Sequence, residues 1–113
     1  MMLSCANSSP KKAEAVEKIK LYKLEVVAEY PHDVTAYTQG LFFQDGQLYE
    51  STGQYGSSTF RKVDLTSGKA LHKFGLNEKY FVEGSVMLGD NLYILTWVEN
   101  VAFVYDARTL KYK

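Results

Sequence analysis

The sequence predicts an all-β fold, a β-propeller assembled from repeated four-stranded blades. The first observation is an internal repeat, because two stretches of the chain match at an offset of 44 residues. The matching pairs are Gln39-Gly40 with Glu83-Gly84, Gln47-Leu48-Tyr49 with Asn91-Leu92-Tyr93, and Thr52 with Thr96. The second observation is that aromatic residues make up 14% of the chain, which suits strands. A repeat of this length in a strand-rich sequence is typical of one propeller blade.

Turn residues divide the first repeat into four expected strands. Asp45-Gly46 predicts a tight hairpin, a Gly- and Ser-rich loop follows at 53–58, and Thr66-Ser67-Gly68 predicts another turn. The strands between these turns are expected at 40–43, 47–52, 59–64 and 69–74. This is the plan of one complete blade.

The second repeat follows the same plan. Its strands are expected at 84–88, 92–97 and 101–106, with a fourth beginning at Leu110. Before the first repeat, residues 21–30 are rich in β-branched and aromatic residues and predict an outer strand that completes another blade. No helix is expected beyond a turn or two at 13–18.

Two repeats are fewer than the three or more that such arrays need, because each repeat buries its apolar face only against its neighbours. We therefore expect the chain to be a piece of a longer protein, and any activity to belong to the full-length parent.

The formal net charge is zero, so the sequence has no excess of basic residues of the kind that binds nucleic acid. No apolar run approaches the length of a transmembrane helix.

The N-terminus contains Cys5, the single cysteine, so an internal disulfide is excluded. Its surroundings resemble the end of a bacterial lipoprotein signal, although the charged and apolar regions that should precede it are missing. The alternative is an ordinary N-terminal tail. We expect residues 1–19 to be a signal remnant and tether, and 20–113 to be a partial propeller domain. A lipidated Cys5 would place the protein in the bacterial cell envelope, periplasmic or anchored to the membrane.

Familiar catalytic motifs are absent: the sequence has no HExxH, Walker loop, CxxC or GxSxG. His32 and His72 lie far apart and lack a set of metal partners. His72 is interpreted as a surface residue and His32 as a structural loop residue beside Asp33. We expect neither a metal at the site nor a cofactor, and whether a structural metal occupies the channel stays open.

Glu83 is the main candidate for chemistry because it lies at the start of an inner strand, next to Phe81 and near Trp97. A carboxyl group among aromatic side chains loses hydration, which favours its protonated form and suits proton transfer. The alternative is a structural carboxylate that bonds backbone amides, as Gln39 would do in the first repeat. Composition and spacing alone do not separate these two interpretations.

Six blocks of the sequence, in order, resemble the plant-type glutaminyl-peptide cyclotransferases of plants and bacteria, also called glutamine cyclotransferases. The blocks are Tyr30-Pro31-His32-Asp33, Tyr37-Thr38-Gln39-Gly40-Leu41, Leu48 to Gly56, Arg61-Lys62-Val63-Asp64, Tyr80-Phe81-Val82-Glu83-Gly84 and Leu95-Thr96-Trp97. The resemblance implies a five-bladed propeller, of which this chain would supply about two blades and the N-terminal closing strand. Five such repeats need roughly 220 residues.

The resemblance also implies an acyltransferase reaction in which the N-terminal Gln of a peptide cyclises to pyroglutamate and releases ammonia. Glu83 matches the family's catalytic acidic position, where it would carry a proton from the amine to the leaving nitrogen. Gln39 matches an amide near the substrate. Phe81 and Trp97 match aromatic walls of the substrate pocket, and Tyr37 stands where the family usually has Phe.

Two functional classes remain after this comparison. One is the enzyme, with a peptide or protein bearing N-terminal Gln as its partner and Glu83 as proton shuttle. The other is a non-catalytic propeller that binds peptides or scaffolds an envelope complex. Glu83 separates them, because a binding module needs no protonatable group in an aromatic cleft.

Overall fold

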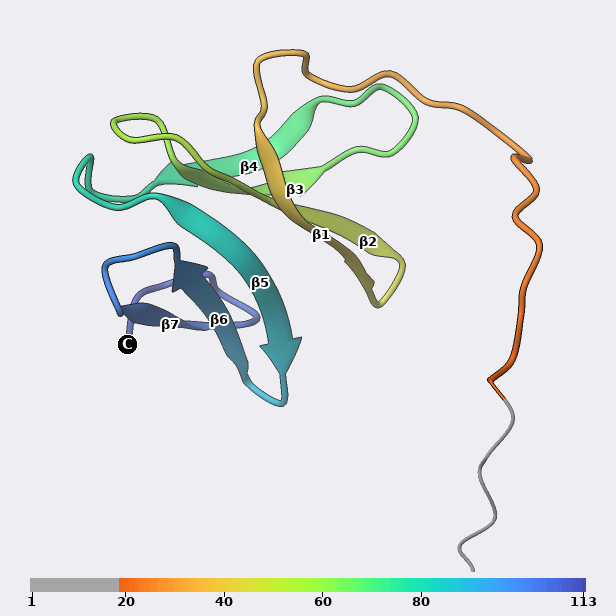
Figure 1. The fold of residues 1–113 in the computed structure, drawn as a ribbon. Helices are drawn as coiled ribbons and strands as arrows, with labels where there is room; N and C mark the ends of the chain where they lie inside the picture. The colour runs from red at the N-terminus through yellow and green to blue at the C-terminus, as the bar shows by residue number, and fades with distance from the viewer. Residues whose placement is uncertain (1–18) are drawn as a thin grey trace, which may run out of the picture.

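The computed structural model describes residues 19–113, which form two antiparallel β-sheets and contain no helix (Figure 1). The strands are β1 (Thr38–Gln44), β2 (Gln47–Thr52), β3 (Thr59–Val63), β4 (Ala70–Gly75), β5 (Val82–Leu88), β6 (Asn91–Thr96) and β7 (Ala102–Asp106). Each of these strands lies within two residues of its predicted position. The prediction of an all-β architecture is confirmed for this part of the chain.

The first sheet has the order β1-β2-β3-β4, so each strand pairs with the next one in sequence. Its first hairpin turns at Asp45 and Gly46, which both have positive φ, at 50° and 75°. Two consecutive positive φ angles fit the right-handed twist of the paired strands. The predicted hairpin is therefore confirmed, and the sheet has the four strands expected of one blade.

The second sheet has the order β5-β6-β7 and repeats the first three strands of this plan. The fourth strand expected from Leu110 is wrong as a regular strand. Only an isolated bridge forms, between Tyr105 and Tyr112, and the rings of these residues lie 5.4 Å apart. Because a single bridge provides little backbone pairing, residues 110–113 do not extend the sheet as a strand.

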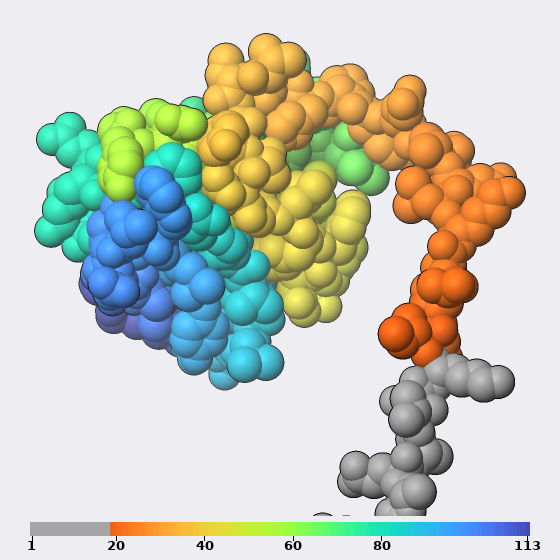
Figure 2. Space-filling view, viewed as in Figure 1, coloured from red at the N-terminus to blue at the C-terminus, as the bar shows by residue number. Residues whose placement is uncertain are grey.

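No strand forms at 21–30, because residues 19–30 have no strand assignment. The strand was expected to complete a blade other than these two, so it stays a prediction. Residues 19–30 extend away from the two sheets, as Figure 2 shows, and their apolar side chains are exposed, including Leu21, Leu24 and Val27. High β-propensity does not produce a strand without a neighbouring strand to accept its backbone hydrogen bonds. Cys5 and the helical turn expected at 13–18 lie outside the described residues.

The core lies between the two sheets. Phe60 of β3 is fully buried together with Val82, Leu92 and Ile94 of the second sheet. Each such side chain contributes about 1.5–3 kcal/mol when it leaves water. Two more aromatic rings are in contact between the sheets nearby: the ring centroids of Phe74 in β4 and Tyr105 in β7 lie 4.8 Å apart. Each sheet therefore buries one face against the other, as stacked blades do.

The inner strands β1 and β5 lie side by side (Figure 1). A Cβ atom at Gly40 would contact the hydroxyl of Ser51 and would lie only 2.9 Å from the backbone nitrogen of Ser85. Glycine is thus required here by the approach of the second sheet. Gly84, at the equivalent position of the second repeat, has open space around its Cα.

We expect Gly40→Ala to lower the free energy of unfolding by about 1–3 kcal/mol, because the added methyl group separates the two inner strands. Gly84→Ala is the matched control and should change stability by much less. Urea unfolding followed by circular dichroism measures both variants. Equal midpoints for the two variants would show that the contact at Gly40 does not limit how the sheets pack.

Candidate functional site

Gln39 and Glu83 both lie at β-bulges, at equivalent positions of the two repeats. In the first sheet Thr38 pairs with Thr52 while Gly40 pairs with Ser51, so Gln39 is an extra residue in β1. The second sheet shows the same shift between Val82 and Ser85, where β5 contains one residue more than β6. A bulge bends its strand and redirects a side chain, and bulges are common beside active sites.

The two bulges face each other across the contact between the inner strands. The hydroxyl of Ser51 in β2 donates a hydrogen bond to the backbone carbonyl of Glu83, with an oxygen–oxygen distance of 2.8 Å. The hydroxyl of Ser85 donates in turn to the Ser51 oxygen at 3.0 Å. The structure therefore brings the carboxyl-bearing bulge of one repeat next to the amide-bearing bulge of the other. The side chains of Gln39 and Glu83 are both half-buried.

An aromatic cluster lies at the same end of the inner strands, with Phe81 at its centre. Its other members are Tyr37, Tyr55 and Trp97, whose ring centroids lie 6.2, 5.5 and 5.7 Å from that of Phe81, all edge-on. Three of these residues were predicted from the sequence, and they do come together around Phe81. The outer three rings are more than half exposed, so the cluster offers an apolar surface to a ligand.

The sequence analysis missed Tyr55 and Glu99, which lie against each other at the edge of this cluster. Hydrogen bonding to the Glu99 carboxylate raises the pKa of the Tyr55 hydroxyl. Burial raises the pKa of Glu99, but hydrogen bonding from Tyr55 and from nearby backbone amides outweighs burial and lowers it overall. The oxygen Oε2 of Glu99 is buried without a hydrogen-bond partner in the described part of the chain. Tyr55 and Glu99 are 44 residues apart, so the offset of the repeat could have identified them as equivalent positions.

Two buried charged residues of the first sheet hold the loop at 31–37, which leads into β1. The His32 ring nitrogen Nε2 lies 2.8 Å from an oxygen of Glu50, which is 1% exposed. The buried Arg61 donates to Asp33 at 2.7 Å. His32 thus makes a structural contact, as interpreted from the sequence. His72 is exposed, also as expected.

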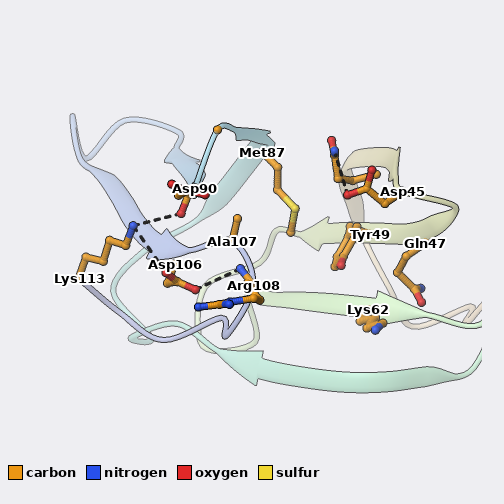
Figure 3. Close-up of a pocket in the computed structure, with 12 residues that line it drawn as sticks. Asp45, Gln47, Tyr49, Lys62, Met87, Asp90, Asp106, Ala107, Arg108 and Lys113 are labelled. Carbon is orange, nitrogen blue, oxygen red and sulfur yellow. Dashed lines mark hydrogen bonds and ion pairs between the residues drawn. The ribbon is translucent and has the colours of Figure 1, made fainter.

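The structure also contains a large cavity that includes none of the predicted site residues. It measures about 830 Å³ and lies between the two sheets, where the β1–β2 and β5–β6 hairpins turn (Figure 3). Two of its charged residues make local contacts: Asp106 caps the turn at 107–109, and Lys113 donates to the carbonyl of Asp90 at 3.1 Å. The cavity therefore lies apart from the site that the sequence predicts.

Within residues 19–113 no group of three or more His, Cys, Asp or Glu side chains could hold a metal ion. In the same residues no helix is long and apolar enough to cross a membrane.

Comparisons with known proteins point to one family. The sequence model of the family described as glutamine cyclotransferase matches residues 1–113. A glutaminyl-peptide cyclotransferase of Arabidopsis thaliana is 46% identical over 92 residues, which cover 80% of this chain and 29% of that protein. The crystal structure of a Myxococcus xanthus glutaminyl cyclase matches with a TM-score of 0.68 at 34% identity, covering 79% of this chain and 37% of the other. The chain thus spans about a third of the length of these relatives.

The loop contacts of Asp33 generate a prediction about pH. Hydrogen bonds from the Thr35 hydroxyl and amide and from Arg61 hold the pKa of Asp33 well below its ordinary value of 3.8. Because the folded-state pKa is lowered, the stabilisation is present above the ordinary value and is lost as the pH falls below it. The difference in melting temperature between the parent and Asp33→Asn should therefore be largest above about pH 5 and should shrink progressively as the pH falls below about 4.

Circular dichroism melting curves across this pH range test the prediction. Glu25→Gln, in the exposed stretch before the loop, is the control and should match the parent at every pH. A difference between the parent and Asp33→Asn that does not shrink between about pH 4 and about pH 2 would contradict the assignment.

Proposed function

Since the chain belongs to the glutamine cyclotransferase family, we propose that its full-length protein is a glutaminyl-peptide cyclotransferase. This enzyme converts the N-terminal Gln of a peptide or protein into pyroglutamate and releases ammonia. The observation that supports the proposal is the pair of equivalent bulges at Gln39 and Glu83, which Ser51 joins, together with the aromatic cluster around Phe81, two residues before Glu83. A carboxyl and an amide beside apolar rings suit a small polar substrate group that has to exchange a proton.

The reaction needs one proton to change place. The free α-amine attacks the carbon of the side-chain amide, a new C–N bond forms, and negative charge develops on the amide oxygen. Glu83 accepts the proton that the amine loses and gives it to the side-chain nitrogen, whose bond to carbon then breaks to release ammonia. The amide of Gln39 can donate to the developing oxyanion or accept from the amine. Tyr37, Phe81 and Trp97 pack against the substrate and reduce its contact with water.

We also propose that the described sheets are two blades of a five-bladed propeller. The repeat of 44 residues and the coverage of about a third of the related chains support this proposal. The exposed apolar residues at 19–30 fit a strand that pairs with a blade outside this chain. The remaining site residues would then come from later blades. A structure of the full-length protein with a different number of blades would overturn this proposal.

We propose that Cys5 is lipidated and that the protein is held at the bacterial cell envelope, on the grounds of the lipoprotein-like sequence around Cys5. In a bacterial host that makes the full-length protein, radioactive palmitate should label the parent and not Cys5→Ala. Equal labelling of the two proteins, or none of either, would refute the proposal.

For the enzyme, we expect Glu83→Gln to lower turnover by about 10²–10⁴-fold, because the amide cannot carry a proton. The melting temperature should stay close to that of the parent, since the substitution preserves size and leaves the Ser51 bond to the backbone carbonyl intact. Ammonia release from a Gln-initiated peptide by the full-length protein measures the effect.

Glu78→Gln is the matched control, because it makes the same substitution at an exposed residue. It should retain parental turnover. Near-parental turnover in Glu83→Gln would refute the proton-shuttle role. Full-length protein that binds Gln-initiated peptides without releasing ammonia would favour the non-catalytic binding propeller.

A further inference from the structure

Ser51 is the residue through which the first sheet contacts the bulge at Glu83. It belongs to β2, is fully buried, and pairs with Gly40 immediately after the bulge of β1. Its hydroxyl donates to the carbonyl of Glu83 at 2.8 Å. One side chain therefore joins the two bulges, which belong to different sheets.

The backbone at a bulge is less constrained than in a regular strand, because the extra residue has no partner of its own across the ladder. A shift of the peptide after Glu83 that moves the Cα atom of Glu83 would also displace the carboxyl group. The bond from Ser51 holds this peptide from the neighbouring sheet, and the Ser85 hydroxyl completes the chain by donating to Ser51 at 3.0 Å. The direction of the Glu83 side chain thus depends on a residue of the other repeat.

Space around Ser51 supports this assignment. A Cβ atom at Gly40 would collide with the Ser51 hydroxyl, and it would also lie within 3.2 Å of the Ser85 hydroxyl. The hydroxyl is therefore confined to one location and cannot turn toward solvent. A buried hydroxyl with both a donor and an acceptor partner is a fixed element, and it transmits the position of β2 to Glu83.

We propose that Ser51 is a positioning residue for the cyclisation, holding the carboxyl group of Glu83 in line with the bulge at Gln39. This proposal rests on the proposed function of Glu83. Ser51 does not touch the reacting atoms itself. Its effect on the reaction passes through the backbone carbonyl of Glu83.

The experiment is steady-state ammonia release by the full-length protein, comparing the parent with Ser51→Ala. We expect kcat to fall by about 10- to 100-fold while KM changes much less, because a misplaced proton carrier slows the chemical step more than it weakens binding. Ser67→Ala, which removes an exposed turn hydroxyl in the same sheet, is the control and should retain the parental kcat.

A double-mutant cycle separates positioning from a general loss of structure. In a Glu83→Gln background, Ser51→Ala should lower the residual rate by less than twofold, because Glu83 is no longer there to be positioned. An equal fold-loss in both backgrounds would overturn the proposal and leave Ser51 as a packing residue only.

Ser51→Thr and Ser51→Val form a second test should Ser51→Ala fold poorly. The two side chains have the same shape, but only Thr keeps the hydroxyl. The kcat of Ser51→Thr should therefore exceed that of Ser51→Val by about tenfold or more. Equal rates would overturn the proposal.

Crystal structures of the Thr and Val variants provide a readout that does not need turnover. The Glu83 carbonyl should keep its place in the Thr variant and turn away in the Val variant, and an unchanged carbonyl in both would overturn the proposal. A full-length protein that releases no ammonia would refute the function. These structures would still decide what Ser51 does.

Discussion

The approach of the inner strands at Gly40 is the constraint on which the rest of the site depends. Without a Cβ atom there, β1 lies close enough to β5 for Ser51 and Ser85 to hydrogen bond between the sheets. The same approach aligns the two bulges, although the residues that form them are 44 positions apart in the chain. Hydrophobic burial brings the sheets together, but it has no direction. The hydrogen bonds of Ser51 and Ser85, together with the missing side chain of Gly40, determine how the two sheets are aligned.

The site arises where the two copies of one repeat differ. Both copies bulge at the same position, yet one carries the amide of Gln39 and the other the carboxyl of Glu83. The position of Trp97 in the second copy is occupied by Gly53 in the first, and a Cβ atom there would collide with the ring of Phe81. The first copy thus leaves room for an aromatic ring of the second. Equivalent backbones supply the scaffold, and the two unlike side chains supply the groups of the proposed reaction.

Local patterns predicted the strands well, because turn residues such as Asp45 and Gly46 determine where a hairpin reverses. No strand forms at 21–30, because a strand needs a neighbouring strand to pair with, and local propensity does not say whether one is present. The sequence did not predict side-chain partners either. The bond between His32 and Glu50, for example, forms only once the loop folds back over the first sheet. The bulges themselves were not foreseen, although the offset had already placed Gln39 and Glu83 at equivalent positions.

The exposure of the proposed site shows what the proposed reaction would still require. The Glu83 side chain is half-buried, and Tyr37 and Trp97 expose more than half of their surfaces. Proton transfer between an amine and an amide nitrogen is most effective where water does not compete for the proton or weaken the hydrogen bond to the oxyanion. Two adjacent sheets can fix the direction of the carboxyl group, but they cannot enclose it. In the proposed enzyme, positioning would therefore be a property of the contact between these two repeats, whereas exclusion of water would require other surfaces to cover them.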